Sequence, residues 1–304
     1  MESEFVAWLR DRVPMHPQLT LGIGDDAAVL SLPSCRCVVT SDMLMDGTDF
    51  ILSESDPRRV GRKALAVNLS DLAAMASKPV AAIVSLAIPT TASIEMTKAI
   101  YEGLLELADE YEVALAGGDT NTWKHPFAIS VTLIGEPTAR GVLTRSGARA
   151  GDAILVTGEF GGSILGRHFD FRPRVNEALY LHQRFDLHAG LDVSDGLSLD
   201  LSHLARDSSC GAIIDASRVP ISADALRLSE QAPDSGSPLD HALGDGEDFE
   251  LILAVSVETA NRIVADQSIG IPVTRIGEFV AEPGLWLRGD TGECQPLTPR
   301  GYEH

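Results

Sequence analysis

The hydrophobic positions in the first half of the chain alternate between short continuous runs and segments with helical spacing. Apolar residues spaced three and four apart predict a short opening helix at 2–13, a long helix at 56–77 and another at 93–111. Continuous or alternating apolar runs predict strands at 28–32, 36–40, 80–88, 113–116 and 127–135. Strands that alternate with helices are typical of an α/β domain.

A polar stretch rich in glycine and arginine at 136–151 separates this series from a second one. Beyond it, the pattern predicts strands at 153–157, 191–193, 212–214, 249–255 and 273–276. Helices are predicted between them at 197–207, 222–231 and 257–267. We therefore expect a mixed α/β (α+β) protein of two domains, 1–137 and 138–304.

The composition excludes several classes of protein. The chain has 304 residues, 44% of them hydrophobic, which is enough for a buried core. Its formal net charge of −20 repels nucleic acid and anionic membranes. The first residues lack the basic and apolar regions of a signal peptide, and the longest apolar run, 80–89, is too short to cross a bilayer. The four cysteines form no CxxC pair. We expect a cytoplasmic protein with no membrane or nucleic-acid partner and no zinc site.

Acidic residues recur beside glycines and near the ends of predicted strands. Taken singly, each also fits an ordinary turn or a helix N-cap, where aspartate is common. Taken as a set, they lie where ligands collect in α/β proteins. The members of the set are Asp26, Asp42, Asp119, Asp192 and Asp195.

Asp71 differs from these acids because it lies inside an apolar helix. A carboxylate is costly to bury there unless a cation meets it. A position on the helix surface, or an ion pair with Arg62 or Lys63, would also explain it. If Asp71 meets the other acids, ligation by oxygen alone favours Mg²⁺, with Mn²⁺ as the other hard cation. Such cations would let an acidic protein hold ATP.

Several common catalytic motifs are absent from the sequence. The chain has no GxxxxGK[ST] P-loop, no protein-kinase motif set, no HExxH helix and no GxSxG elbow. A glycine-rich turn at 157–163 follows a predicted strand and could present backbone N–H groups to a phosphate. An ordinary strand-to-helix turn is the simpler interpretation of that segment.

Five segments, taken in order, resemble the motifs of the thiamine-monophosphate kinase family. They read GIGDDAA at 22–28, GRKALAVNLSDLAAM at 61–75, GGDT at 117–120, DVSDGL at 192–197 and GEDFEL at 246–251. The resemblance extends from about residue 22 to residue 302. It implies a two-domain aminoimidazole ribonucleotide synthetase-like fold, with N-terminal sheets that pair in a homodimer and a C-terminal α/β domain. It also implies ATP as co-substrate and several Mg²⁺ ions.

The resemblance further implies roles for individual residues. Metal ligation is expected of Asp26, Thr40, Ser41, Asp42, Asp71, Asp119, Asp192 and Asp195. Nucleotide contacts are expected of Tyr101, Gly118, Asp119, Arg145 and Ser194. Glu247 and Tyr302 match positions that hold the thiamine portion. The catalytic set implied is Asp42, Asp71, Asp119 and Asp192, which would hold Mg²⁺ between the donor and acceptor phosphates.

Two departures from the family pattern bear on the acceptor. Asp49 stands where the family usually has a histidine that contacts substrate, and the stretch between 162 and 173 is short. The expected reaction is in-line transfer of the ATP γ-phosphoryl group to thiamine monophosphate. Three alternatives stay open: an ATP-dependent enzyme of the same fold with another small phosphorylated metabolite as acceptor, a non-catalytic nucleotide-binding module, and a purely structural acidic protein.

Overall fold

The computed structural model of the chain describes residues 8–9, 12–13, 16–21, 29–30, 36–266 and 269–302. The chain divides into two compact units. The first comprises Met1–Leu72 and Ser77–Pro137, and the second comprises Ala73–Ala76 and Thr138–His304. Most of the predicted opening helix and all of the motif at 22–28 lie outside the described residues.

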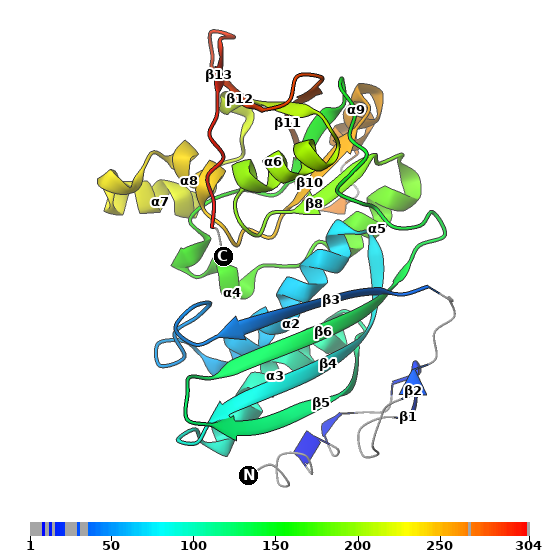
Figure 1. The fold of residues 1–304 in the computed structure, drawn as a ribbon, viewed down its shortest axis with the longest axis vertical. Helices are drawn as coiled ribbons and strands as arrows, with labels where there is room; N and C mark the ends of the chain where they lie inside the picture. Colours follow the sequence, from blue (N-terminus) through cyan, green and yellow to red (C-terminus); the bar gives the residue numbers. More distant parts are fainter. Residues whose placement is uncertain are drawn as a thin grey trace. The chain divides into compact units, whose positions relative to one another are not determined.

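In its described residues, the first unit contains a four-stranded sheet with two long helices on one face (Figure 1). The strand order is β3-β6-β4-β5, in which β4 and β5 run parallel and the other neighbours antiparallel. The elements are β3 (Val38–Met45), α2 (Pro57–Ala74), β4 (Ser77–Pro89), α3 (Ile94–Glu110), β5 (Ala114–Trp123) and β6 (Ala128–Pro137).

The short strands β1 (Leu19–Leu21) and β2 (Val29–Leu30) pair with each other. The predicted strand at 36–40 instead pairs with β6 and continues to Met45, so that it carries Asp42 within the sheet. The predicted helix at 93–111 is confirmed as α3, which begins after Ser93, whose hydroxyl accepts a hydrogen bond from the Met96 N–H.

Helices α2 and α3 approach closely because a glycine lies at each of two contact points. A Cβ atom at Gly61 would overlap the carbonyl oxygen of Ile100, and one at Gly103 would overlap that of Arg58. The first of these glycines belongs to the motif at 61–75, so part of that motif serves helix packing. The close contact fixes α2, and with it Asp71, against the rest of the unit.

The second unit is built on a seven-stranded sheet in its described part, with order β13-β12-β9-β11-β7-β10-β8. Neighbouring strands are antiparallel except β12 and β9, which are parallel. The strands are β7 (Ala153–Thr157), β8 (Ala189–Asp192), β9 (Gly211–Asp215), β10 (Leu251–Val255), β11 (Val273–Val280), β12 (Leu285–Arg288) and β13 (Cys294–Pro296). The α-helices are α4 (Arg167–Asp170), α5 (Val175–Arg184), α6 (Leu197–Asp207), α7 (Ala223–Gln231), α8 (Pro238–Gly244) and α9 (Val257–Ala265).

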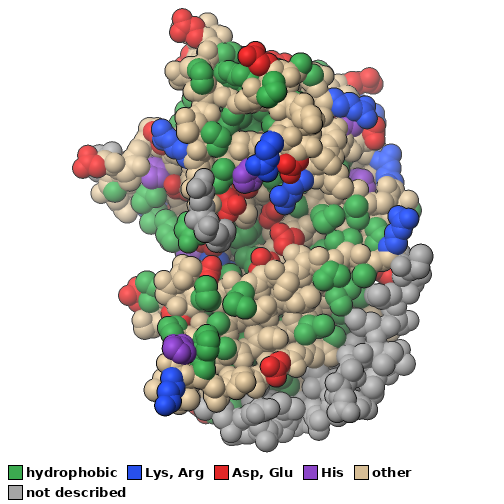
Figure 2. All heavy atoms as spheres, viewed as in Figure 1, with side chains coloured by type: hydrophobic (Ala, Val, Ile, Leu, Met, Phe, Trp, Pro, Cys, Tyr) green, Lys and Arg blue, Asp and Glu red, His purple; other side chains and the backbone are tan. Residues whose placement is uncertain are grey.

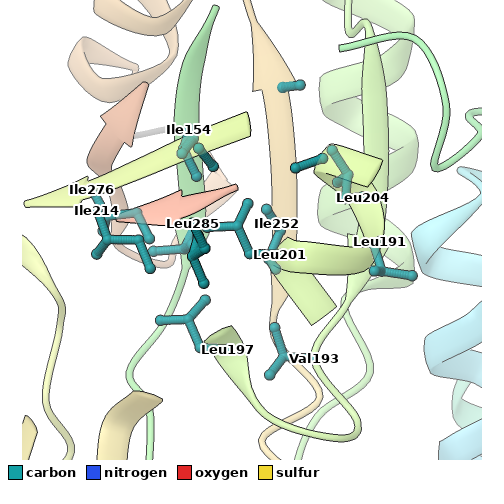
Figure 3. Close-up of a cluster of buried hydrophobic side chains, with 14 of the residues drawn as sticks. Ile154, Leu191, Val193, Leu197, Leu201, Leu204, Ile214, Ile252, Ile276 and Leu285 are labelled. Carbon is teal, nitrogen blue, oxygen red and sulfur yellow. The ribbon is translucent and has the colours of Figure 1, made fainter. Parts of the chain in front are cut away.

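The core of the second unit joins helix α6 to the sheet. Leu201 and Leu204 of α6 belong to the same buried cluster as Ile252 and Leu191 of neighbouring strands (Figure 3). Each such side chain contributes about 1.5–3 kcal/mol when fully buried. The cluster therefore holds β8 and α6 in place, and the motif DVSDGL, which connects them, is fixed at both ends.

No helix in the part of the chain that the structure describes is long and apolar enough to cross a membrane.

Candidate active site

Two facing carboxylates lie on the inner face of the first unit's sheet. Asp42 of β3 and Asp71 of α2 lie close enough for their charges to interact. The Thr40 hydroxyl donates a hydrogen bond to the Asp71 carboxylate. Burial, and then the charge of Asp71, raises the pKa of Asp42 to about 7. Asp71 is therefore part of a carboxylate pair and not an isolated acid on a helix surface.

This donor set fits a hard divalent cation. Among the described residues, the Oδ2 atom of Asp42 is buried and has no hydrogen-bond partner, a state that favours either a proton or a cation. Carboxylate and hydroxyl oxygens are the ligands that Mg²⁺ prefers. No group of three or more His, Cys, Asp and Glu residues in the described ranges could hold a metal ion. Asp42 and Asp71 could therefore supply two carboxylate groups to a larger set of ligands.

Asp49 closes the turn after β3. Its Oδ2 atom accepts a hydrogen bond from the Met45 N–H at 2.7 Å. The fully buried Lys63 donates from Nζ to the Asp49 carbonyl oxygen at 2.9 Å. The Asp49 charge also contributes, after burial and Asp71, to the raised pKa of Asp42. The acid at this position therefore stabilises the turn beside the carboxylate pair.

Ser41 and Asp119 lie on the outer, exposed face of the same sheet. The hydroxyls of Ser41 and Thr132 are 2.9 Å apart and hydrogen-bonded. Asp119 is in register with the exposed Ser85 of β4. Because β3 and β5 are the two edge strands, Asp42 and Asp119 are separated by three strand spacings, about 14 Å. One copy of the sheet does not bring these two acids together.

Three further residues, Gly118, Tyr101 and Arg145, were expected to contact the nucleotide, and each has a different environment. Gly118 packs against β4 so closely that a Cβ atom would overlap the Val84 carbonyl oxygen. Tyr101 of α3 is 2% exposed, and burial raises its pKa. Arg145 is exposed in the segment before β7. Gly118 and Tyr101 thus have structural roles in the first unit whatever they contact in addition.

Three segments of the second unit meet through backbone hydrogen bonds. The Glu247 N–H donates to the Ser194 carbonyl oxygen at 2.7 Å, and the Tyr302 N–H donates to that of Asp195 at 2.9 Å. Asp192 lies at the end of β8 and is buried. The structure therefore brings together the DVSDGL motif, the GEDFEL motif and the C-terminal segment. These segments are far apart in the sequence.

Asp200 organises the DVSDGL loop and was not among the predicted residues. Its carboxylate accepts hydrogen bonds from the backbone N–H groups of Asp195 and Gly196, each at 3.0 Å. Burial raises its pKa to about 7, although the Gly196 N–H opposes the shift. An aspartate in the first turn of a predicted helix was the available signal, because such an acid often caps the turn before it.

The glycine-rich turn at 157–163 does not keep its donors available for a phosphate. The Gly161 N–H donates to both carboxylate oxygens of Asp248 at 3.0 Å, and the Gly162 N–H donates to Asp245 at 2.8 Å. These contacts favour the strand-to-helix interpretation of the turn. Of the remaining predicted residues, Asp26 lies outside the described part of the chain.

Comparison with known proteins identifies relatives of both units. Residues 24–136 match the family described as AIR synthase related protein, N-terminal domain, and residues 139–289 match its C-terminal domain. The chain is 43% identical over 312 residues to the thiamine-monophosphate kinase of Rhodopirellula baltica, covering 100% of this chain and 97% of that protein. It resembles the crystal structure of thiamine-monophosphate kinase from Stenotrophomonas maltophilia K279a at 34% identity and TM-score 0.79, over 96% of each chain. It also resembles AaThiL complexed with AMPPCP and TMP, at 28% identity and TM-score 0.78, over 93% of this chain and 91% of that one.

Proposed function

The chain belongs to the thiamine-monophosphate kinase family, and from this we propose that it transfers the γ-phosphoryl group of ATP to thiamine monophosphate, giving thiamine diphosphate and ADP. A relative that is 43% identical over the full length of this chain supports this activity, as does a structural neighbour complexed with AMPPCP and TMP. The observation in this chain that carries the proposal is the facing pair of Asp42 and Asp71, with one carboxylate oxygen buried and unpartnered among the described residues.

In the proposed mechanism, Asp42, Asp71 and Thr40 would hold Mg²⁺, which when bound neutralises the charge of the phosphates in phosphoryl transfer. The acceptor is a phosphate monoester whose second pKa is near ~6, so its attacking oxygen is already ionised at neutral pH. No general base and no enzyme nucleophile are then required. The task of the side chains is to bind and orient donor and acceptor for direct in-line transfer.

The remaining assignments are part of the same proposal. The N-terminal domain, 1–137, binds ATP and Mg²⁺ and forms the dimer, and residues 138–304 form the C-terminal α/β domain. Ser41, Asp119, Asp192, Asp195 and Asp26 are proposed as further metal ligands. Tyr101, Gly118, Asp119, Arg145 and Ser194 are assigned to the nucleotide. Asp49, Glu247 and Tyr302 are assigned to the acceptor.

We propose a homodimer that forms through the outer face of the β3-β6-β4-β5 sheet. Val39 is 57% exposed and Met43 is 60% exposed on β3, and Ile83 of β4 and Trp123 of β5 are also exposed. Figure 2 shows hydrophobic side chains over this exposed face. An apolar surface of this kind favours association. It is also the face to which Ser41 is directed.

The positions of Asp42 and Asp119 support a shared site in that dimer. Because the two acids lie on opposite edge strands and on opposite faces of the sheet, a single metal site that uses both requires the edge of β3 in one protomer to meet the edge of β5 in its partner. Each dimer would then contain two equivalent sites, each with one acid from either protomer.

A steady-state assay with ATP, Mg²⁺ and a panel of phosphorylated acceptors tests the proposed function. We expect thiamine monophosphate to have the highest kcat/KM and thiamine diphosphate to be the product, identified by chromatography. Preferred transfer to another acceptor would support a different enzyme of the same fold. ATP binding without ADP formation on any acceptor would support a non-catalytic module. The absence of any Mg²⁺-dependent thermal shift with a nucleotide analogue would support a purely structural protein.

A further inference from the structure

The backbone that carries Glu247 has an uncommon conformation. Glu247 and Phe249 both have left-handed backbone, with φ of 62° and 52°. Residues other than glycine adopt this conformation when their surroundings hold them there. Asp248 lies between the two and is 2% exposed. The contacts around Asp248 therefore decide how Glu247 is presented.

Arg167 links the Asp248 carboxylate to the glycine-rich turn. Its guanidinium donates to Asp248 Oδ1 at 2.7 Å, to the Glu159 carbonyl oxygen at 2.8 Å and to the Gly161 carbonyl oxygen at 3.0 Å. The Gly161 N–H also donates to both oxygens of Asp248. A planar guanidinium can serve these three acceptors at once, whereas an ammonium group cannot match the arrangement.

Two neighbouring residues repeat this pattern of support. Phe171 stacks on Phe249, with ring centroids 4.1 Å apart and an interplanar angle of 17°. Arg174 donates from Nε to Glu250 Oε2 at 2.7 Å and forms a second hydrogen bond to Oε1. Three side chains of one short connection, which includes α4, thus hold three successive residues of the GEDFEL motif.

We propose that Arg167 is a positioning residue, which acts through Asp248 to keep the left-handed turn that presents Glu247 to the acceptor. The proposal rests on the proposed function, because Glu247 is assigned there to the acceptor. It gives the short stretch between 162 and 173 a specific task in this chain. Burial raises the pKa of Asp248 to about 8 even with Arg167 beside it, so removal of Arg167 need not leave a buried unpaired charge, and R167A is expected to fold.

The kinetic test compares R167A, R167K and the control R206A in the full-length protein. Arg206 is an exposed arginine of the same unit that pairs with Asp207, so its removal should change neither KM. We expect R167A to raise the KM for thiamine monophosphate by roughly tenfold to a hundredfold while the KM for ATP changes less than about twofold. R167K should recover part of the loss, because Lys can still donate to Asp248. Equal changes for both substrates, or no change, would overturn the proposal.

A double variant separates this proposal from the assignment of Glu247. If Arg167 acts through Glu247, R167A/E247A should be no worse than E247A, whereas additive losses would contradict the proposal. An unchanged acceptor KM in E247A would contradict the assignment of Glu247 and the positioning role together. A raised KM in E247A with an unchanged KM in R167A would contradict the role of Arg167 alone.

Hydrogen exchange provides a measurement that does not depend on activity or on R167A being folded. The N–H groups of Glu247 and Phe249 donate to the carbonyl oxygens of Ser194 and Val193. In R167K we expect these two amides to exchange about tenfold faster than in the wild type, since the turn opens more often. Equal exchange rates in the two proteins would overturn the proposal, and R206A should match the wild type.

Discussion

At the residue scale, the proposed metal site depends on the effect of Asp42 and Asp71 on each other. Two carboxylates in contact repel unless a proton or a cation lies between them, and the raised pKa of Asp42 expresses that repulsion together with burial. A proton on Asp42 relieves this repulsion, and the pKa of Asp42 is accordingly raised to about 7. In the proposed enzyme a bound divalent cation would take the place of that proton, and the repulsion between the two residues favours metal binding.

Replacing Asp71 by asparagine should therefore lower turnover by about a hundredfold or more with little loss of folded structure. An amide keeps the hydrogen bond from Thr40 but removes the charge that holds the cation. The number of bound Mn²⁺ ions can be obtained from the free Mn²⁺ signal in electron paramagnetic resonance. D71N should bind at least one ion fewer per chain than the wild type. The exposed variant D109A on α3 is the control. Unchanged turnover and metal binding in D71N would leave Asp71 with a structural role only.

The buried Asp248 should make stability fall as the pH rises. Its folded pKa of about 8 lies above the usual 3.8 of an unfolded aspartate, because burial, with Asp245 and Glu250 nearby, outweighs the opposing effect of Arg167 and the Gly161 N–H. Between those two pH values the Asp248 carboxyl is ionised in the unfolded chain but protonated in the folded one. The free energy of unfolding therefore falls by up to about 1.4 kcal/mol per pH unit as the pH rises. Denaturant unfolding of wild type and D248N should be measured from pH 5 to pH 8. Over this range the free energy of unfolding of the wild type should fall relative to that of the variant. A constant difference would contradict the prediction.

The sequence could identify Asp71 but not its contacts. A carboxylate in an apolar helix is costly, and this singled out Asp71, whereas its hydrogen bond with Thr40 depends on where β3 packs. Asp200 and Asp248 escaped prediction because their partners are backbone N–H groups or an arginine in distant segments. The polar character of Asp248 gave no indication that it would be buried.

At the scale of elements, two glycines allow α2 and α3 to pack closely. In G103A the added Cβ would overlap the Arg58 carbonyl oxygen, so the helices must separate. Alanine improves helix propensity by about 1 kcal/mol over glycine, but overpacking at this contact should cost on the order of 3 kcal/mol. Scanning calorimetry should therefore show a lower unfolding temperature for G103A than for wild type. The control D109A should unfold at the same temperature as wild type. A rise in G103A would contradict the close contact.

Elements with strong periodicity were predicted well, and those with polar exposed faces were not. The α3 helix was predicted within a residue of its ends because Ser93 caps it and its apolar spacing is regular. The strands β3 and β5 extend well past their predicted ends, since Ser41, Asp42 and the run from Gly117 do not have strand propensity. Helix α5 was missed because Arg174, its N-cap, makes no side-chain cap.

At the scale of the whole molecule, the shared site predicts complementation between inactive subunits. D42N and D119N should each be inactive as homodimers. In a mixed dimer one site combines both substitutions and the other combines the intact Asp42 and Asp119. After unfolding and refolding of an equal mixture, about one quarter of wild-type activity should return, because half of the dimers are mixed and each has one intact site. No recovery in a mixture shown to contain mixed dimers would contradict a site shared between protomers.

The acidic composition of the chain opposes the binding of anionic substrates. A chain with a formal net charge of −20 repels both ATP and a phosphorylated acceptor unless cations intervene. We propose that the paired carboxylates hold such cations at one place, which would allow direct transfer between the two substrates without an enzyme nucleophile. The central claim is therefore that phosphate passes from ATP to thiamine monophosphate in a single Mg²⁺-dependent step.

Phosphorus NMR of a single turnover, with enzyme in excess over both substrates, tests this claim most directly. The account predicts that the ATP γ-phosphorus signal is replaced by the terminal phosphorus of thiamine diphosphate, with one ADP formed per product and no reaction after chelation of Mg²⁺. A phosphorylated enzyme, inorganic phosphate as the main product, or the same rate in the presence of chelator would contradict it.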